Sequence, residues 1–183
     1  DQPVITAQAA LTTPEETDLT ITLADLTVTD PDNTYPGDFT LTVNTGTNYT
    51  VSGTTITPAV DFNGTLTIPV TVNDGAIDSD VFNVSVTVTA VNDKPIITSH
   101  VSKTVTIGIS FDIELSELTV SDPDNTFPTD FTLTIAAGDT YSVSGNSVIV
   151  NEFNDGSIDI MLSVSDGDLD SELYLFSVTV ESG

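Results

Sequence analysis

Apolar and small polar residues alternate along Phe82-Asn83-Val84-Ser85-Val86-Thr87-Val88. A period of two places the apolar side chains on one face of the segment, as in a β-strand with one buried face. The same pattern recurs at residues 19–23, 39–43, 131–135 and 176–180. The polar partner is most often Thr, whose β-branched side chain favours strands. The sequence therefore predicts an all-β protein.

The chain contains an internal repeat. A shift of 92 residues aligns Asp1 with Asp93, and 37 of the 91 aligned positions are then identical. The best-matched block includes Asp-Pro-Asp-Asn-Thr, which occupies residues 30–34 and again residues 122–126. A period near 90 is much longer than that of a solenoid repeat, so each copy must form a domain with its own core.

We expect the domain boundaries to follow this repeat. Turn-forming Gly, Asn and Asp residues recur every eight to twelve residues, which gives about seven strands per copy. That number is typical of an immunoglobulin-like Greek-key β-sandwich. The sequence thus predicts one sandwich over residues 1–91, a short extended linker at residues 92–95, and a second sandwich over residues 96–183. Val148-Ile149-Val150 is expected to be buried throughout.

The charge balance excludes several functions. The 183 residues include 28 Asp and Glu but only two Lys and Arg, so the formal net charge is −26. Nucleic acid and anionic lipid would be repelled. The absence of Cys and the presence of a single His leave little for nucleophilic catalysis, so we expect no enzyme activity. The sequence lacks an apolar run long enough to span a membrane and an N-terminal signal pattern, so we expect a soluble fragment that has been processed or excised.

The acidic residues are concentrated in particular loops. Asp30 and Asp32 flank a proline directly after a predicted strand, and Asp122 and Asp124 repeat this arrangement. Three further acids should lie at the same ends of the sandwiches: Asp74 and Asp166, which open Asp-Gly turns before the last strand, and Asp93 in the linker. Two such charges ~5 Å apart repel by roughly 3 kcal/mol at an effective dielectric constant near 20. A Ca²⁺ ion, which takes six to eight oxygen ligands, would relieve that repulsion. The alternative is a solvated acidic rim that keeps the chain soluble.

A self-contained EF-hand loop is a weaker alternative. Asp166, Asp168 and Asp170 occupy its first, third and fifth positions. Ser171 and Ser177 stand at the sixth and twelfth positions, where Gly and Glu are needed.

Together these motifs resemble the cadherin-like tandem repeats of large, RTX-type bacterial surface adhesins. The resemblance rests on Glu15-Glu16-Thr17, the repeated Asp-Pro-Asp, the Asp-Gly turns and Asn92-Asp93-Lys94-Pro95, and it covers the whole chain. It implies calcium at the module junctions. The implied ligands at the junction of the two copies are Glu15 with its neighbour Glu16, Asn92, Asp93, Asp122, Asp124 and Asp166. Asp30, Asp32 and Asp74, together with Asp1, would serve a junction with a preceding module.

The resemblance also implies a role. We expect calcium-rigidified extender repeats in the stalk of a secreted bacterial cell-surface adhesin, which supports cell adhesion or biofilm formation. The chain would be a monomer whose partners are neighbouring repeats, while other domains contact a host or matrix glycan or protein. The alternative is a carbohydrate- or protein-binding module that makes the adhesive contact itself. Trp is absent, so Tyr35 and Phe127 are the candidates for an exposed aromatic platform.

Overall fold

A computed structural model describes residues 1–151 and 156–182 of the chain. The chain divides into two compact units, Asp1–Val91 and Asn92–Gly183. Residues 92–95, expected as a separate linker, belong to the second unit. Among the described residues, no helix has the length and apolar character needed to cross a membrane.

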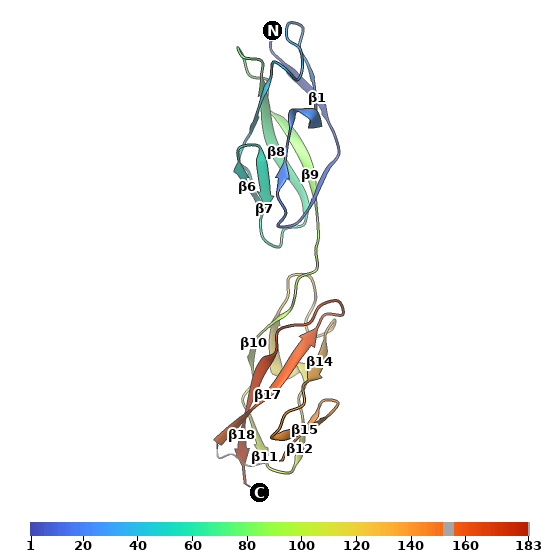
Figure 1. Cartoon of the computed structure of the whole chain (residues 1–183), viewed down its shortest axis with the longest axis vertical. Helices are drawn as coiled ribbons and strands as arrows, with labels where there is room; N and C mark the ends of the chain where they lie inside the picture. Colours follow the sequence, from blue (N-terminus) through green and yellow to red (C-terminus); the bar gives the residue numbers. More distant parts are fainter. Residues whose placement is uncertain (152–155, 183) are drawn as a thin grey trace. The chain divides into compact units, whose positions relative to one another are not determined.

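The first unit is built from nine strands (Figure 1). They are β1 (Val4–Gln8), β2 (Leu11–Pro14), β3 (Leu19–Thr20), β4 (Leu26–Thr29), β5 (Thr40–Val43), β6 (Tyr49–Ser52), β7 (Thr55–Pro58), β8 (Gly64–Asn73) and β9 (Phe82–Thr89). A four-stranded sheet has the order β2-β9-β8-β5, a three-stranded sheet has the order β3-β7-β6, and β1 pairs with β4. All pairs are antiparallel except β2 with β9, which is parallel.

The second unit repeats this topology. Its strands are β10 (Ile96–His100), β11 (Lys103–Thr106), β12 (Ser110–Asp112), β13 (Leu118–Ser121), β14 (Thr132–Ile135), β15 (Tyr141–Ser144), β16 (Ser147–Val150), β17 (Gly156–Ser165) and β18 (Tyr174–Glu181). The sheets have the orders β11-β18-β17-β14 and β12-β16-β15, and β10 pairs with β13. The expected all-β architecture of two tandem β-sandwiches is therefore confirmed.

Each core lies between the sheets of its unit. Along β9 the residues Val84, Val86 and Val88 are buried, while Ser85 and Thr87 are exposed, as the alternating pattern predicts. The neighbouring β8 buries Leu66, Ile68, Val70 and Val72 in the same manner. Burial of each such side chain contributes about 1.5–3 kcal/mol relative to full exposure. Both units thus have a complete hydrophobic core of their own.

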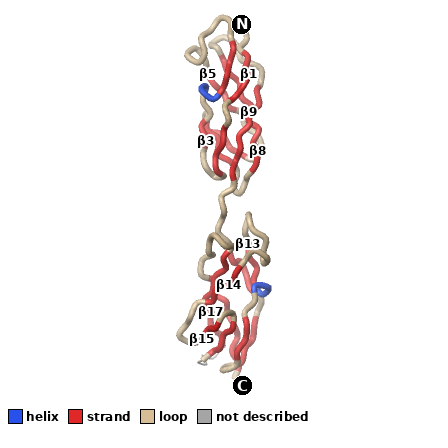
Figure 2. Tube along the Cα trace, turned by 90° about the vertical axis from the view of Figure 1, so that its right-hand side faces the viewer, coloured by secondary structure: helices blue, strands red, loops and turns tan. Residues whose placement is uncertain are grey.

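Each unit contains nine strands instead of about seven, and one short 3-10 helix interrupts the run of strands in each unit. A short 3-10 helix, η1 (Leu23–Asp25), separates β3 from β4, and η2 (Leu115–Glu117) separates β12 from β13 (Figure 2). The Asp25 side chain begins this turn by accepting hydrogen bonds from the N–H and hydroxyl of Thr22, both at 2.7 Å. The prediction of a strand over residues 19–23 was therefore too long, since the strand ends at Thr20.

Two expectations about burial were wrong. Ile149 is 37% exposed between the buried Val148 and Val150, because β16 keeps the ordinary alternation of a half-buried strand. Tyr35 and Phe127 do not form exposed platforms. Both are half-buried against the cores of their units, and the Tyr35 hydroxyl donates a hydrogen bond to the carbonyl of Leu23.

Candidate metal sites

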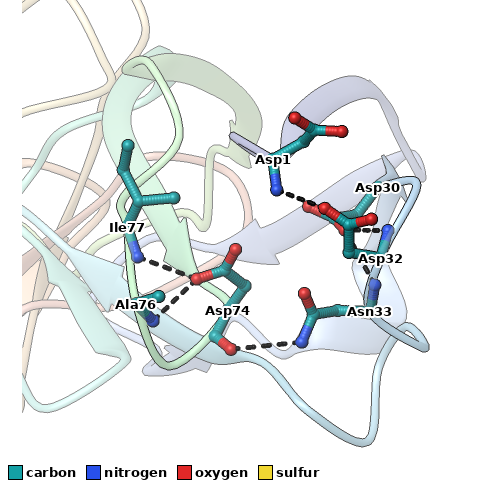
Figure 3. Close-up of polar contacts among 7 residues, drawn as sticks. All are labelled: Asp1, Asp30, Asp32, Asn33, Asp74, Ala76 and Ile77. Carbon is teal, nitrogen blue, oxygen red and sulfur yellow. Dashed lines mark hydrogen bonds and ion pairs between the residues drawn. The ribbon is translucent and has the colours of Figure 1, made fainter.

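One end of the first unit holds a cluster of aspartates, which we call the first acidic cluster: Asp1, Asp30, Asp32 and Asp74. Asp30 directly follows β4, and Asp74 directly follows β8. Figure 3 shows the polar contacts of these residues. Asp30 Oδ1 accepts hydrogen bonds from the backbone N–H groups of Asp32 and Asn33, both at 2.8 Å, and this fixes the loop. The Asn33 side chain reaches across to the carbonyl of Asp74, 3.5 Å away. The predicted meeting of these two loops at one end of the sandwich is thus confirmed for the first unit.

The amino group of Asp1, the first residue of the sequence, lies beside this cluster. It donates a hydrogen bond to Asp32 Oδ2 at 2.6 Å (Figure 3). That hydrogen bond is the main cause that raises the pKa of the amino group, and the charges of Asp32, Asp30 and Asp74 raise it further.

The aspartates that open the Asp-Gly turns, Asp74 and Asp166, accept hydrogen bonds from backbone N–H groups of their own turns. Asp74 Oδ1 accepts hydrogen bonds from the backbone N–H groups of Ile77, at 2.8 Å, and Ala76, at 2.7 Å (Figure 3). These hydrogen bonds, with that from Ile77 the largest cause, lower the pKa of Asp74. In the second unit the backbone of Leu169 is the first cause that lowers the pKa of Asp166, and Asn92 and Asp168 contribute. Both buried carboxylates are therefore held in the charged form.

The second acidic cluster comprises Asn92, Asp93, Asp122, Asp124 and Asp166. Asn92 Nδ2 donates a hydrogen bond to Asp166 Oδ2 at 2.9 Å, and the backbone N–H of Asp93 donates to Asp124 Oδ2 at 2.8 Å. Asp122 Oδ1 accepts from the N–H groups of Asp124 and Asn125, as Asp30 does in the first unit. All five expected residues of this cluster therefore meet at one end of the second unit.

Both clusters contain oxygen atoms that are buried but unpaired. Asp30 Oδ2, Asp122 Oδ2 and Asn125 Oδ1 have no hydrogen-bond partner among the residues that the structure describes. Buried polar atoms are normally paired, and an unpaired one costs about 1–3 kcal/mol. The sequence does not single out Asn125 as a ligand, although Asn is present in both copies of Asp-Pro-Asp-Asn-Thr. Three unpaired oxygen atoms in loops rich in carboxylates match the ligand chemistry of Ca²⁺.

The carboxylates are close but do not form an assembled ligand sphere. Within residues 1–151 and 156–182, no group of three or more His, Cys, Asp or Glu side chains is arranged so that it could hold a metal ion. Several oxygen atoms point instead to backbone N–H groups, which partly offset their mutual repulsion. A cation would have to draw these side chains together.

Glu15 and Glu16 lie apart from the first acidic cluster. They follow β2, whose last residue, Pro14, pairs with Thr89 at the end of β9, whereas Asp74 lies before β9 begins. Glu15 is only 5% exposed, and its Oε1 accepts a hydrogen bond from the backbone N–H of Val91 at 2.5 Å. Glu16 is exposed and has a φ of +57°. The expected ligands thus form three groups: the first acidic cluster, the second acidic cluster, and the pair Glu15 and Glu16.

Comparison with known proteins agrees with this architecture. Residues 1–87 match a bacterial Ig domain. The match covers the first of the two repeated units, and the second unit shares its topology and its spacing of acidic residues. No curated protein matches the chain.

Solved cadherin structures share the fold. Human Protocadherin-24 EC1-2 (form II) superposes with a TM-score of 0.52 at 14% sequence identity, over 98% of this chain and 98% of the other. The extracellular cadherin domains 1–5 of Protocadherin Gamma B2 give a TM-score of 0.54 at 18% identity, over 99% of this chain but 39% of that longer one. The chain is thus cadherin-like in fold, as expected.

Proposed function

We propose that this chain is a tandem pair of calcium-binding extender modules from the stalk of a bacterial cell-surface adhesin. The bacterial Ig domain match and the cadherin-like fold support an extracellular repeat module. Two separate cores in tandem suit a spacer, since repeated modules add length without a catalytic cleft. Neighbouring modules would be the direct partners, and the stalk would hold an adhesive region away from the cell to support adhesion or biofilm formation.

The unpaired oxygen atoms are the observation that carries the calcium assignment. In the second unit, Asp122 Oδ2 and Asn125 Oδ1 are buried and have no hydrogen-bond partner in the described part of the chain, and Asp122 contacts the backbone of Asp124. In the first unit, Asp30 Oδ2 has no hydrogen-bond partner among residues 1–151 and 156–182, and Asp32 and Asp74 belong to the same cluster. Oxygen-only ligand sets with several carboxylates suit Ca²⁺ better than softer metals. The bound ion would supply the positive charge that these clusters lack.

Residues 91–93, called the connecting segment, join the two units, and hydrogen bonds anchor this segment to each unit. These anchors support a role for calcium in making the connection rigid. The Glu15 side chain accepts a hydrogen bond from the N–H of Val91 within the first unit. The Asp166 side chain accepts one from the Asn92 side chain within the second unit. These two anchored residues are neighbours in the chain. If Ca²⁺ binds Asn92, Asp93 and Asp166 together, bending of the segment would require metal–ligand bonds to break. Calcium would therefore reduce the freedom of the connection between the units.

The alternative, a module that binds a glycan through aromatic side chains, gains no support from the structure. Tyr35 and Phe127, its aromatic candidates, are half-buried against the cores and each packs on a Phe ring of the same loop region, at 5.2 Å and 5.4 Å between ring centroids.

Calorimetric titration with Ca²⁺ tests the assignment. In Asp122→Asn the Oδ1 acceptor that fixes the loop can be retained, but the charge at the unpaired oxygen is lost. We expect the second acidic cluster to lose its binding heat while the unit stays folded. Asp159→Asn is the matched control, because it removes one charge from the exposed face of β17, where Asp159 accepts a hydrogen bond from Ser177. Equal Ca²⁺ binding by both variants and the parent chain would refute the assignment.

A further inference from the structure

Each unit has a groove between the segment that leads into its first strand and the segment that leads into its last. In the second unit the groove lies between Pro95 and Ile96 on one side and Leu173 and Tyr174 on the other. In the first unit it lies between Pro3 and Val4 and the pair Val81 and Phe82. All seven residues that line one groove correspond to the seven that line the other after the shift of 92 positions. The groove is thus a property of the repeated module.

The groove of the second unit, called the second groove below, has the larger exposed apolar wall. Ile96 is 61% exposed and Leu173 62%, and the cavity measures about 150 Å³ against about 90 Å³ in the first unit. A cavity of roughly 150 Å³ is large enough for a benzene-sized group. The groove can therefore hold one large apolar side chain.

The apolar surface continues beyond the second groove. Leu175 lies two residues after Leu173, and its cross-strand neighbour on β17 is Met161. Leu175 is 55% exposed and Met161 37%. The corresponding residues of the first unit are Asn83 and Pro69, which also pair with each other. Exposed apolar surface that continues over several neighbouring residues is typical of an interaction site. Only the second unit extends its groove in this way.

The rim of the second groove is charged. Lys94 Nζ lies 2.5 Å from Glu172 Oε1, and the hydrogen bond from Lys94 is the main cause that lowers the pKa of Glu172. Asp168 and Asp170 precede Glu172 and are exposed. In the first unit the corresponding contact is a weaker one, from Gln2 Nε2 to Asp80 Oδ1 at 3.3 Å. Because Lys94 already pairs with Glu172, the negative charge available to a positively charged partner comes from Asp168 and Asp170 in the exposed turn that precedes the groove.

We propose that the second groove binds an extended, basic peptide segment of another protein. A large apolar side chain of that segment would lie between Ile96 and Leu173, with the next apolar side chain over Leu175. A Lys or Arg of the segment would pair with Asp168 or Asp170, since Lys94 already occupies Glu172. The net charge of −26 indicates the type of partner. It repels a second copy of this chain, whereas it attracts a basic segment over a distance.

Fluorescence anisotropy of a labelled peptide in which Lys alternates with Leu tests this proposal on the full chain. A peptide in which Lys alternates with Ser has the same charge and reports binding to the acidic surface as a whole. We expect the Lys-Leu peptide to bind at least about tenfold more tightly, and the double variant Ile96→Ser with Leu173→Ser to remove about that tenfold advantage. Val4→Ser with Val81→Ser, in the first unit, is the matched control and should change the affinity little.

Each outcome decides the question. Thermal unfolding of both double variants checks that they fold, which is expected because the substituted side chains are more than half exposed. Equal binding of the two peptides, or equal effects of the two double variants, would overturn the proposal and leave only non-specific attraction. Sedimentation that shows a concentration-dependent dimer lost in Ile96→Ser with Leu173→Ser would also overturn it, with a second copy as the occupant. Titrations in Ca²⁺ and in EDTA separate this proposal from the calcium assignment, since Lys-Leu binding in either condition suffices.

Discussion

Asn92 donates a hydrogen bond through Nδ2 to Oδ2 of Asp166 at 2.9 Å, across 74 positions of the sequence. This contact joins the segment before β10 to the turn between β17 and β18. It is also one of the causes that lower the pKa of Asp166, after the backbone hydrogen bond from Leu169. The charge state of Asp166 is thereby linked to the attachment of the connecting segment within the second unit.

Asp166 should make the stability of the second unit depend on pH. Its pKa is lower in the folded state than the ordinary value of 3.8, so its charge stabilises the fold fully above pH 3.8. This contribution is lost as the pH falls below 3.8 through the folded-state pKa. We expect the difference in unfolding free energy between the parent chain and Asp166→Asn to shrink over that range, measured by urea unfolding. The difference in unfolding free energy between the parent chain and Asn92→Ala should also shrink over that range, but by less. Unfolding free energies of the parent chain and Asp166→Asn that change in parallel with pH would contradict the prediction.

Calcium should raise the melting temperature. Extracellular calcium modules commonly bind with a Kd of about 10⁻⁴–10⁻³ M. A ligand that binds only the folded state at 10–100 times its Kd stabilises it by about 1.4–2.7 kcal/mol. For units of this size each kcal/mol raises Tm by roughly 4–8 °C. About 10 mM Ca²⁺ corresponds to 10–100 times that Kd. Differential scanning calorimetry in this Ca²⁺ concentration and in EDTA measures the shift, and identical melting curves would contradict the calcium assignment.

Replacing Asn125 should lower the Ca²⁺ affinity of the second unit without destabilising the calcium-free protein. Asn125→Ala removes a buried oxygen atom that has no partner among the described residues, so it should not destabilise the calcium-free protein. It also removes a ligand, so the Ca²⁺ affinity of the second unit should fall by about tenfold. Unfolding in EDTA and calorimetric titration give the two values. Loss of stability in EDTA together with unchanged affinity would show that Asn125 has a purely structural role.

The distance between the two units should become better defined in calcium. Because the chain contains no Cys, Thr67→Cys on β8 and Thr179→Cys on β18 provide one exposed spin-label site in each unit. We expect pulsed electron paramagnetic resonance to give a narrower distance distribution in Ca²⁺ than in EDTA. Adding Asp122→Asn should restore the broader distribution in Ca²⁺. Equal widths in Ca²⁺ and EDTA would limit calcium to a role in folding.

Gly138 is required by the packing of Tyr141. A Cβ atom at Gly138 would lie 2.3 Å from Tyr141 Cε1, and one at Gly46 would lie 2.5 Å from the Tyr49 hydroxyl oxygen in the first unit. Gly138→Ala should therefore cost about 1–3 kcal/mol of unfolding free energy, because the buried ring must move. Gly53→Ala is not a suitable control because its φ is +63°. Gly37→Ala, which meets no atom closer than 3.8 Å, should have little effect on urea unfolding.

The repeat and the buried faces of the main strands could be predicted from the sequence alone. The alternation Val84, Val86, Val88 predicts the buried face of β9, because side-chain direction in a strand depends only on the local backbone. The apolar period does not predict the interruption at Leu23–Asp25. The interruption depends on the Asp25 side chain, which accepts a hydrogen bond from the backbone N–H of Thr22.

The loops of the candidate sites could be predicted from the sequence, but the contacts within the sites could be seen only in the tertiary structure. Asp-Pro-Asp-Asn-Thr and the Asp-Gly turns identified the loops from the sequence, since residue types and their spacing determine which groups can coordinate a cation. Three features could be seen only in the fold: Asn92 meets Asp166, Glu15 accepts a hydrogen bond from the N–H of Val91, and Asp122 Oδ2 and Asn125 Oδ1 are buried with no partner among the described residues. The grooves at Val4 and Ile96 likewise follow from the structure alone. Burial and partner choice depend on which loops of a sandwich come together, and the pairing of strands distant in sequence decides that.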